Sequence, residues 1–265
     1  MRESPALIES RRFGVRHIPA LRPLGWLARG WRDLKRCPLP GLLHGLALAL
    51  FGGALLWLAH DQFWLLSGAF TGFLLVGPVL ATGLYAVSRA LEQGQRADLS
   101  VALAAWKPQR RLVFFGLLLA LAGTGWVLTS ASLITVFAAE PVRNPIDFLR
   151  VVVLNEESML FEAWLMMGGL LAAPVYASSV IAMPLLLDRN VSVLAAVLTS
   201  WRVVQQHLLP MVIWAAMLMA LTLLGMATAL LGLVVIAPWL SHASWHAYRD
   251  LVSVEHPGLT GQSGD

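Results

Sequence analysis

The sequence predicts an all-α, polytopic membrane protein with six transmembrane helices, and three observations support this. Of its 265 residues, 58% are hydrophobic and only 13% are charged, whereas about a quarter of the residues in a soluble domain are charged. The mean hydropathy is +0.70. Stretches without Asp, Glu, Lys or Arg recur along the chain, and each is long enough for the roughly 20 apolar residues that cross a bilayer.

Charge-free stretches mark the spans in order. The first four are residues 38–59, 63–88, 112–139 and 163–187. The final stretch decides the count, because the 46 residues between Arg202 and Arg249 carry no Asp, Glu, Lys or Arg. One helix of that length would be roughly 69 Å long, more than twice the thickness of the hydrocarbon core. We therefore expect it to turn back near Gly225, Thr228 and Gly232. The two resulting spans are 208–226 and 229–249.

Positive charge predicts the orientation. If the N-terminus is cytoplasmic, seventeen of the nineteen Lys and Arg lie inside, as cytoplasmic loops require. The region before the first span holds nine of them and lacks the apolar run of a cleavable signal, so the first span is expected to direct its own insertion. The outer loop, about 139–162, is acidic, and Asn144 is expected to cap a short helix through residues 148–154.

The spans are interpreted as three copies of one unit. Each copy contains an interfacial amphipathic helix followed by a two-helix hairpin, and the second helix of each hairpin contains a proline. The copies cover about residues 23–91, 97–188 and 191–251. The prolines expected to kink the hairpins are Pro78, Pro174 and Pro238.

Each interfacial helix carries a Trp followed by a basic residue. Such helices lie in the headgroup plane, so we expect membrane lipids with anionic headgroups to be partners at the cytoplasmic face. The predicted membrane-interface anchors are Trp31, Arg32, Trp106, Lys107, Trp201 and Arg202. The apolar face of the first helix is predicted to be Leu24, Leu27, Trp31 and Leu34, with Arg29, Arg32, Asp33 and Arg36 opposite.

The predicted domain organisation is simple. A cytoplasmic tail covers residues 1–22, a single six-span membrane domain covers 23–251, and a disordered cytoplasmic tail covers 252–265. The formal charge of +4 is explained by the basic inside segments, and no nucleic-acid-binding motif accompanies it. The single cysteine, Cys37, excludes an internal disulfide.

Catalytic motifs are missing from the sequence, and we expect no enzyme activity. There is no nucleophile elbow, zinc-protease motif, phosphate-binding loop or dinucleotide fingerprint. The predicted spans contain no Asp, Glu, Lys or Arg apart from Arg249, the final residue of the last span. Ion-coupled carriers keep such groups at membrane depth, so a proton- or sodium-driven carrier is disfavoured.

Two histidines are the candidate site. His242 and His246 are four residues apart and share one face of the last span. One interpretation makes them interfacial histidines hydrogen-bonded to neighbouring helices, with no cofactor. The other makes them contacts to haem, a transition metal or a quinone. Candidate third ligands are His207, Cys37 and Asp188. His44, in the first span, could pair with the His242 face.

Three segments resemble a known family. They are Gly-Leu-Tyr-Ala-Val-Ser-Arg-Ala-Leu-Glu at 83–92, Met-Pro-Leu-Leu-Leu-Asp-Arg-Asn at 183–190 and Ser-His-Ala-Ser-Trp-His-Ala-Tyr-Arg-Asp-Leu at 241–251. The chain, from about residue 20 to 251, resembles the bacterial predicted integral membrane proteins filed as domain of unknown function 2189. The resemblance implies a multi-pass protein of the bacterial cytoplasmic (inner) membrane. It implies no activity and no site residues.

The leading hypothesis is a non-catalytic membrane protein that acts as a scaffold, assembly partner or envelope component. One alternative is a haem- or metal-binding membrane protein that uses His242 and His246. The other is a passive small-molecule or lipid transporter working between the repeats. A bound chromophore would support the first alternative, and a polar, water-filled cavity would support the second.

Overall fold

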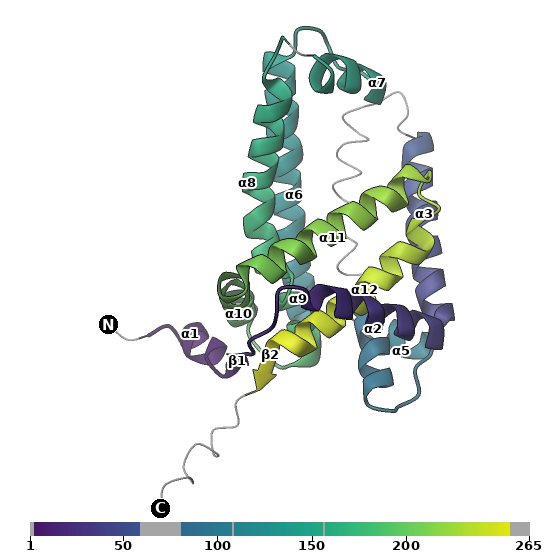
Figure 1. Cartoon of the computed structure of the whole chain (residues 1–265), viewed down its shortest axis with the longest axis vertical. Coiled ribbons are helices and arrows are strands. Elements are labelled where there is room, and N and C mark those ends of the chain that lie inside the picture. The colour runs from purple at the N-terminus through teal and green to yellow at the C-terminus, as the bar shows by residue number, and fades with distance from the viewer. Residues whose placement is uncertain (1–2, 59–80, 108, 156, 255–265) are drawn as a thin grey trace, which may run out of the picture.

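The computed structural model describes residues 3–58, 81–107, 109–155 and 157–254 (Figure 1). The described elements, in chain order, are α1 (Pro5–Ser10), β1 (Phe13–Val15), α2 (Arg22–Arg36), α3 (Pro38–Leu58), the helical residues 81–92, α5 (Leu99–Ala104), α6 (Arg110–Phe137), α7 (Pro145–Asp147), the π-helical η1 (Phe148–Val153), α8 (Leu160–Ser179), α9 (Ala182–Asp188), α10 (Val193–Gln206), α11 (Leu208–Ala227), α12 (Leu233–Leu251) and β2 (Val252–Val254). The prediction of an all-α architecture is confirmed for these residues.

Four helical stretches of the described chain are long and apolar enough to cross a membrane. They are Pro38–Trp57, Arg110–Phe137, Leu160–Asp188 and Leu208–Ala227. They match the predicted first, third, fourth and fifth spans. Most of the second, 63–88, lies outside the described residues, as does Pro78. The sixth, 229–249, corresponds to α12, which is helical but is not among the four. Six spans and a threefold repeat therefore remain predictions.

The turn between α11 and α12 lies where the sequence places it. Helix α11 ends at Ala227, and Ala229 and Leu230 then adopt the left-handed conformation, with φ of 52° and 69°. The hydroxyl of Thr228 donates to the carbonyl of Gly225 and accepts from the N–H of Gly232, at 2.8 and 2.7 Å. The charge-free stretch between Arg202 and Arg249 is therefore divided between two helices, as its length predicted.

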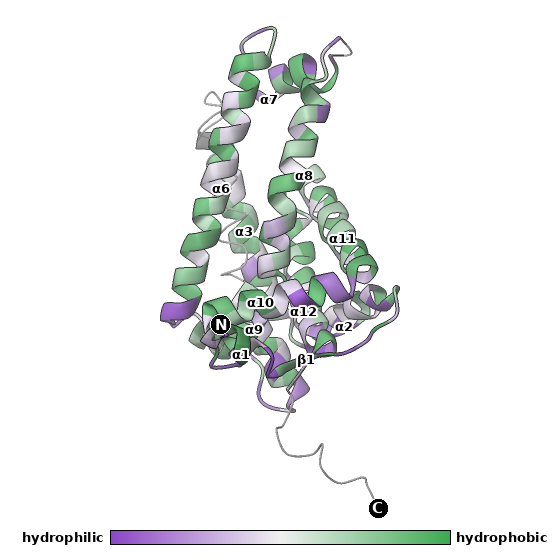
Figure 2. Cartoon of the chain, turned by 90° about the vertical axis from the view of Figure 1, so that its left-hand side faces the viewer, coloured by the Kyte–Doolittle hydropathy of each residue, from purple (hydrophilic) through white to green (hydrophobic). Residues whose placement is uncertain are grey.

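The helices form two regions (Figure 1). Helices α6 and α8 stand side by side as a long hairpin with α7 and η1 at its far end. The other region contains α2, α3, α11, α12 and the helical residues 81–92, and α12 packs closely against α2 and α3. Figure 2 shows that apolar residues cover most of α6, α8 and α11, whereas polar residues gather near α2 and α12.

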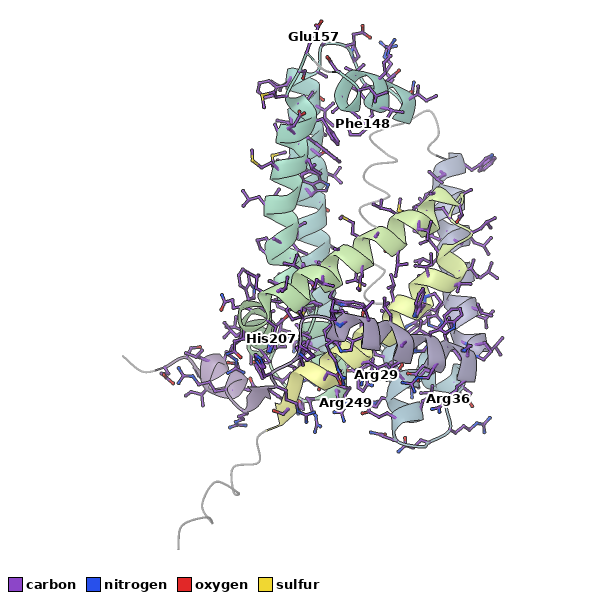
Figure 3. The ribbon with its side chains drawn as sticks, viewed as in Figure 1. Arg29, Arg36, Phe148, Glu157, His207 and Arg249 are labelled. Atoms are coloured by element: carbon purple, nitrogen blue, oxygen red, sulfur yellow. The ribbon has the colours of Figure 1, made fainter. Side chains whose placement is uncertain are left out.

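The outer loop folds as a small cap on the hairpin. The Asn144 side chain accepts from the N–H of Asp147 at 2.8 Å, which confirms the predicted helix start. Val142 and Val152 of this cap are buried against Ile134 and Leu160 of the hairpin helices. This apolar cluster closes the far end of the hairpin. Figure 3 shows Phe148 and Glu157 at this end of the molecule, far from Arg29, Arg36 and Arg249.

Both predicted tails contain secondary structure, so the disorder predicted for 252–265 does not hold for residues 252–254. Strand β1 pairs with β2 in antiparallel register, Phe13 opposite Val254, so residues 252–254 are ordered by hydrogen bonds to the N-terminal segment. Helix α1 packs against α10. The guanidinium of Arg202 donates to the carbonyls of Ser10 and Phe13 and fixes this segment to the body of the protein. Residues 255–265 lie outside the described residues.

Helices α2, α5 and α10 lie where the three interfacial helices were predicted, and α2 buries residues from both of its predicted faces, Leu34 from the apolar face and Asp33 from the polar one. Its buried side chains are Pro23, Trp26, Gly30, Asp33 and Leu34. Leu24 and Trp31, assigned to the apolar face, are 52% and 38% exposed. Helix α10 buries Ala195, Ala196, Thr199, Ser200 and Val203. Small and polar residues such as Gly30 and Asp33 lie in the contacts of these helices together with Trp26 and Leu34.

Candidate functional site

Helix α12 is held against its neighbours by glycine contacts. A Cβ atom added to Gly30 of α2 would lie 2.6 Å from the backbone nitrogen of Ala243. One added to Gly45 of α3 would lie 2.1 Å from the carbonyl oxygen of Val234. Real Cβ atoms do not approach other atoms this closely, so only glycine fits at these crossings. The close approach brings polar side chains of α2 and α12 within hydrogen-bonding distance.

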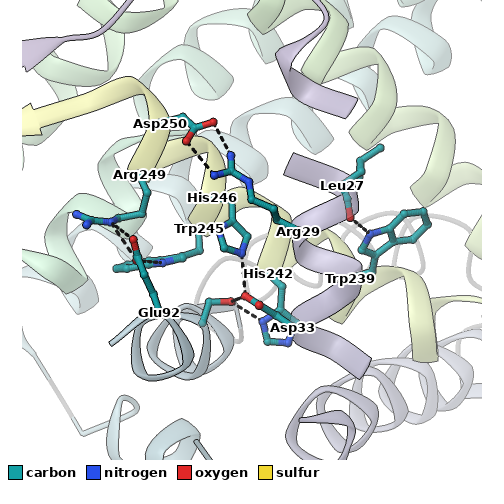
Figure 4. Close-up of polar contacts among 11 residues, drawn as sticks. Leu27, Arg29, Asp33, Glu92, Trp239, His242, Trp245, His246, Arg249 and Asp250 are labelled. Carbon is teal, nitrogen blue, oxygen red and sulfur yellow. Dashed lines mark hydrogen bonds and ion pairs between the residues drawn. The ribbon is translucent and has the colours of Figure 1, made fainter. Parts of the chain in front are cut away.

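A buried polar network joins three helices at this crossing (Figure 4). One carboxylate oxygen of Asp33, on α2, accepts from the Ser88 hydroxyl and from His246 Nε2, each at 2.8 Å. The Ser88 oxygen also lies 2.7 Å from His242 Nδ1. Ser88 and His242 are fully buried, and Asp33 is 6% exposed. Burial makes each of these bonds costly to lose.

The hydrogen bonds assign the protons of the network. The carboxylate of Asp33 only accepts, so His246 Nε2 carries a proton. The single hydroxyl proton of Ser88 points to Asp33, so His242 Nδ1 must donate to the Ser88 oxygen. Burial would raise the pKa of Asp33, but the hydrogen bonds from His246 and Ser88 hold it below its ordinary value of 3.8. The carboxylate is therefore ionised at neutral pH.

A second carboxylate clamps the end of α12 to α2. Asp250 accepts from the Trp26 indole at 2.9 Å, from Arg22 at 2.6 Å and from Arg29 at 3.0 Å. Burial would raise the pKa of Asp250, yet its hydrogen bonds to Arg29, Arg22 and Trp26 lower it to about 2. The ion pairs leave little of this carboxylate exposed. Asp250 is thus an ionised anchor at all physiological pH values.

Tryptophan N–H groups complete the connections around α12 (Figure 4). Trp239 donates to the carbonyl of Leu27 at 2.7 Å, and Trp245 donates to Glu92 at 3.1 Å. Arg249 also donates to Glu92, at 3.1 Å. One of these bonds joins α12 to α2, and the other two join it to the helical residues 81–92. Polar groups on α12 therefore hold it to both neighbours.

The predicted site residues have separate partners. His242 donates to Ser88 and His246 donates to Asp33, so their protonated nitrogens point to two different acceptors and not to one shared ligand. The candidate third ligands lie beside other groups, although the buried Nε2 of His207 has no hydrogen-bond partner. Cys37 Sγ donates to the carbonyl of Ala97, His207 Nδ1 lies 3.4 Å from that of Val203, and Asp188 accepts from the Tyr248 hydroxyl. Among the described residues, no group of three or more His, Cys, Asp and Glu has metal-site geometry.

Asp33 and Ser88 are the site residues that sequence reasoning missed. The sequence placed Asp33 on the solvated face of an interfacial helix, beside three arginines. It is instead buried, because Gly30, one turn earlier, brings α12 close. Glycine at position 30 and aspartate at 33 are adjacent on a helix face. That spacing, opposite a helix with two histidines, is the signal that could have pointed to the network.

The predicted membrane anchors differ in their surroundings. Arg32 and Lys107 are exposed. Trp31 packs against Trp239, with ring centroids 5.3 Å apart, and Trp106 packs against His44 at 4.9 Å. The Trp201 indole donates to Ser178 of α8 at 2.9 Å. Pro174 and Pro238 lie inside α8 and α12, as predicted.

The described residues line two notable hollows. One, of about 70 Å³, lies between α3, α12 and the start of the 81–92 helix, with His44, Gly45, Pro238 and Ser241 in its wall. The other is an open groove of about 430 Å³ between α6, α8 and α10. Its lining is apolar apart from Ser178, whose hydroxyl oxygen is occupied by Trp201. Neither is a polar passage through the molecule.

Comparison with known proteins supports the membrane assignment. A family model described as predicted integral membrane protein, domain of unknown function 2189, matches residues 65–188. The resemblance inferred from the sequence is therefore confirmed over that part of the chain. No curated protein and no solved structure matches the chain.

Proposed function

We propose that this integral membrane protein, similar to a family of unknown function, is a non-catalytic structural component of its membrane. The observation that supports this most directly is how the candidate site uses its polar groups. His242, His246 and Asp33 bond to one another through Ser88 or directly, and they hold α12 to α2 and to the 81–92 helix. Groups engaged in this way stabilise a packed layer and have no substrate position between them.

The geometry gives less support to haem or metal binding by the pair His242 and His246. His246 Nε2 donates to Asp33, so that nitrogen offers no lone pair to a metal in this arrangement. A passive transporter lacks support from the two hollows, since one is small and the other is an apolar surface groove.

The proposed topology follows the charge distribution. Six spans across a bacterial inner membrane, with both termini in the cytoplasm, keep α2, α5 and α10 at the cytoplasmic face. Arg32 and Lys107 are exposed on or beside two of these helices and are available to anionic headgroups. In this proposal the α2–α12 region is a rigid base from which the hairpin of α6 and α8 extends.

An assembly role requires a surface for a partner, and the hairpin offers one. Leu121 of α6 and Leu170 of α8 are 71% and 73% exposed. In lipid, such faces contact either acyl chains or another membrane protein. We propose that part of the hairpin contacts a protein partner.

Site-specific photocrosslinking in native membranes tests this proposal. A photoreactive amino acid at Leu121 is expected to give a discrete protein adduct of reproducible mass. The matched control is Leu119 in the same helix, which is 7% exposed and should give no intermolecular adduct. Adducts with lipid alone from exposed positions all around α6 and α8 would contradict the assembly role.

An absorption spectrum tests the non-catalytic assignment independently. Protein purified in mild detergent should show no haem band, and His246→Ala should lower its thermal stability without changing the visible spectrum. A stoichiometric haem band that disappears in the His242→Ala/His246→Ala double variant would contradict the proposal.

A further inference from the structure

The open apolar groove lies where α10 meets the lower ends of α6 and α8 (Figure 2). Its volume of about 430 Å³ is within the roughly 300–1,000 Å³ of pockets that hold small ligands. Phe114 of α6 and Leu194 of α10, both in its wall, are 52% and 55% exposed. The other lining residues include Leu118, Val175 and Val197. The described chain therefore leaves a concave apolar surface that an apolar ligand can cover.

Two arginines lie at one end of this groove. Arg110 and Arg111 are the first two residues of α6, and Phe114 and Phe115, four residues after them, line the groove. Residues four apart lie on the same face of a helix, one turn from each other. Arg110 is exposed, and no other described residue pairs with its guanidinium. The apolar groove therefore continues into a positively charged end.

Arg111 fixes this end of the groove to the start of α10. Its guanidinium donates to the carbonyl of Val191 at 2.8 Å, two residues before Val193, which lines the groove. An arginine has five N–H donors, so one such bond leaves others for a ligand. The carboxylate of Glu9 lies at the same helix start, where it accepts from the N–H and the hydroxyl of Ser192. Arg111 is thus held in place beside the groove, with donors to spare.

An apolar groove with a cationic end is complementary to a lipid with a negatively charged headgroup. Guanidinium groups bind phosphate oxygens through paired N–H donors. The groove follows α6 from Phe114 to Ala122, about 12 Å along the helix axis. One leaflet of the roughly 30 Å hydrocarbon core is about 15 Å deep, so the groove covers most of the length of an acyl chain. In the proposed topology its charged end faces the cytoplasmic leaflet, where anionic lipids gather.

We propose that this groove binds one anionic phospholipid of the cytoplasmic leaflet. Arg110 and Arg111 bind its phosphate, and the apolar walls of α6, α8 and α10 contact one of its acyl chains. Phosphatidylglycerol fits this description. Phosphatidylcholine has the same phosphate but adds a cation, which the two arginines repel. The inference rests on the proposed contact with anionic headgroups at this face, to which it assigns a defined site, and it is independent of the assembly role.

Thermal unfolding of the purified full chain in detergent with added lipid tests the site. Phosphatidylglycerol should raise the melting temperature of the wild-type protein more than an equal amount of phosphatidylcholine does, because a ligand of the folded state stabilises it. Arg110→Gln/Arg111→Gln should lose most of this difference. The matched control is Arg32→Gln/Lys107→Gln, which removes the same charge from exposed positions outside the groove and should keep the difference.

A variant that fills the groove tests the acyl-chain contact while keeping both arginines. Ala122 is exposed and lines the groove, so Ala122→Phe adds bulk there without removing a buried contact. Native mass spectrometry should show one retained phosphatidylglycerol on the wild-type protein and none on Ala122→Phe. A photoreactive amino acid at Leu194 should capture phospholipid.

Three outcomes would overturn the site, and they differ in what else they overturn. If the two charge variants lose the effect of phosphatidylglycerol equally, anionic lipid is attracted to the whole face, and only the proposed headgroup contact stands. If the wild-type protein does not distinguish phosphatidylglycerol from phosphatidylcholine, that contact fails together with the site. A protein adduct from Leu194 would show that a protein, and not a lipid, occupies the groove. The last two outcomes do not depend on the folding of a charge variant.

Discussion

The hairpin of α6 and α8 is stabilised differently from the layer that α12 forms with α2, α3 and the helical residues 81–92. In α6, the hydroxyls of Thr124, Thr129 and Ser132 each donate to a carbonyl four residues earlier in the same helix. One side-chain hydrogen bond joins the hairpin, from the Trp164 indole to Ser130 at 2.7 Å. Around α12, by contrast, carboxylates, histidines and indoles bond across helices (Figure 4). The comparison indicates that apolar packing shapes the hairpin and polar contacts fix the layer.

The largest expected effect is steric and falls on the layer. Gly45→Ala would place a methyl group against the Val234 carbonyl, so α3 and α12 must separate. We expect a loss of about 3 kcal/mol or more of unfolding free energy, measured by denaturant titration in detergent. Gly53→Ala in the same helix is the control, because nothing lies within 4 Å of its Cβ position. Equal effects at the two positions would show that the crossing is not tight.

The next effect is the loss of the central carboxylate. Asp33→Ala leaves the His246 N–H and the Ser88 hydroxyl without their acceptor in a buried place. We expect it to lower the melting temperature strongly, with a loss of about 3 kcal/mol. Asp33→Asn keeps an oxygen acceptor and should lose less. If both variants melt like the wild-type protein, the network does not stabilise the layer.

The layer should also respond to acid in a way the hairpin does not. The pKa of Asp250 is lowered to about 2 from an ordinary 3.8, so its contribution is full above pH 4 and lost as the pH falls through about 2. The wild-type protein should lose about 2 kcal/mol over this window, and Asp33 adds a loss of the same sign. Melting temperatures at pH 5, 4, 3 and 2 measure this. The curve of Asp250→Asn should be flatter, and a curve as steep as that of the wild type would contradict the assignment.

In the hairpin, loss of the hydrogen bond between α8 and α6 should lower the unfolding free energy less than the changes in the layer do. Trp164→Phe removes the donor to Ser130 but keeps an aromatic ring against Trp126. We expect a loss of about 1 kcal/mol, measured as a shift in the denaturation midpoint. Ser130→Ala should give a loss of similar size, and the double variant should be no worse than the more destabilised single one. Full additivity would indicate that the two residues act separately.

The smallest effect is expected within α6. Thr129→Val replaces a hydroxyl that bonds only to the Gly125 carbonyl of its own helix, at 2.7 Å. Because no neighbouring helix loses a partner, the change in unfolding free energy should stay within about 0.5 kcal/mol. A large loss would mean that polar groups stabilise the hairpin as they do the layer.

The sequence predicted the elements that depend on local patterns. Charge-free length was sufficient for four spans, and the 46-residue stretch required the turn at Thr228. Asn144 predicted the start of the helix in the outer loop because a side-chain cap acts on the residues next to it. These signals need no knowledge of distant parts of the chain.

The contact faces and the site could not be predicted fully, for a physical reason. In water the apolar face of a helix marks its packing surface, but lipid is as apolar as leucine. Leu24 is therefore half exposed, while Gly30 and Asp33 of the same helix are buried. His242 and His246 were identified from their spacing, but their partner Asp33 lies 213 residues from His246 in the chain. Only the glycine crossings bring them together.

A double-mutant cycle between Asp33 and His246 tests most directly whether the histidines stabilise the layer. Asp33→Ala, His246→Ala and the double variant would be unfolded by denaturant in the same detergent, with the wild-type protein as reference. We predict a coupling free energy between Asp33 and His246 of about 1.5 kcal/mol or more, as for a buried, charge-assisted hydrogen bond. Losses that add within about 0.5 kcal/mol would contradict it, because they would show that the two side chains do not act together.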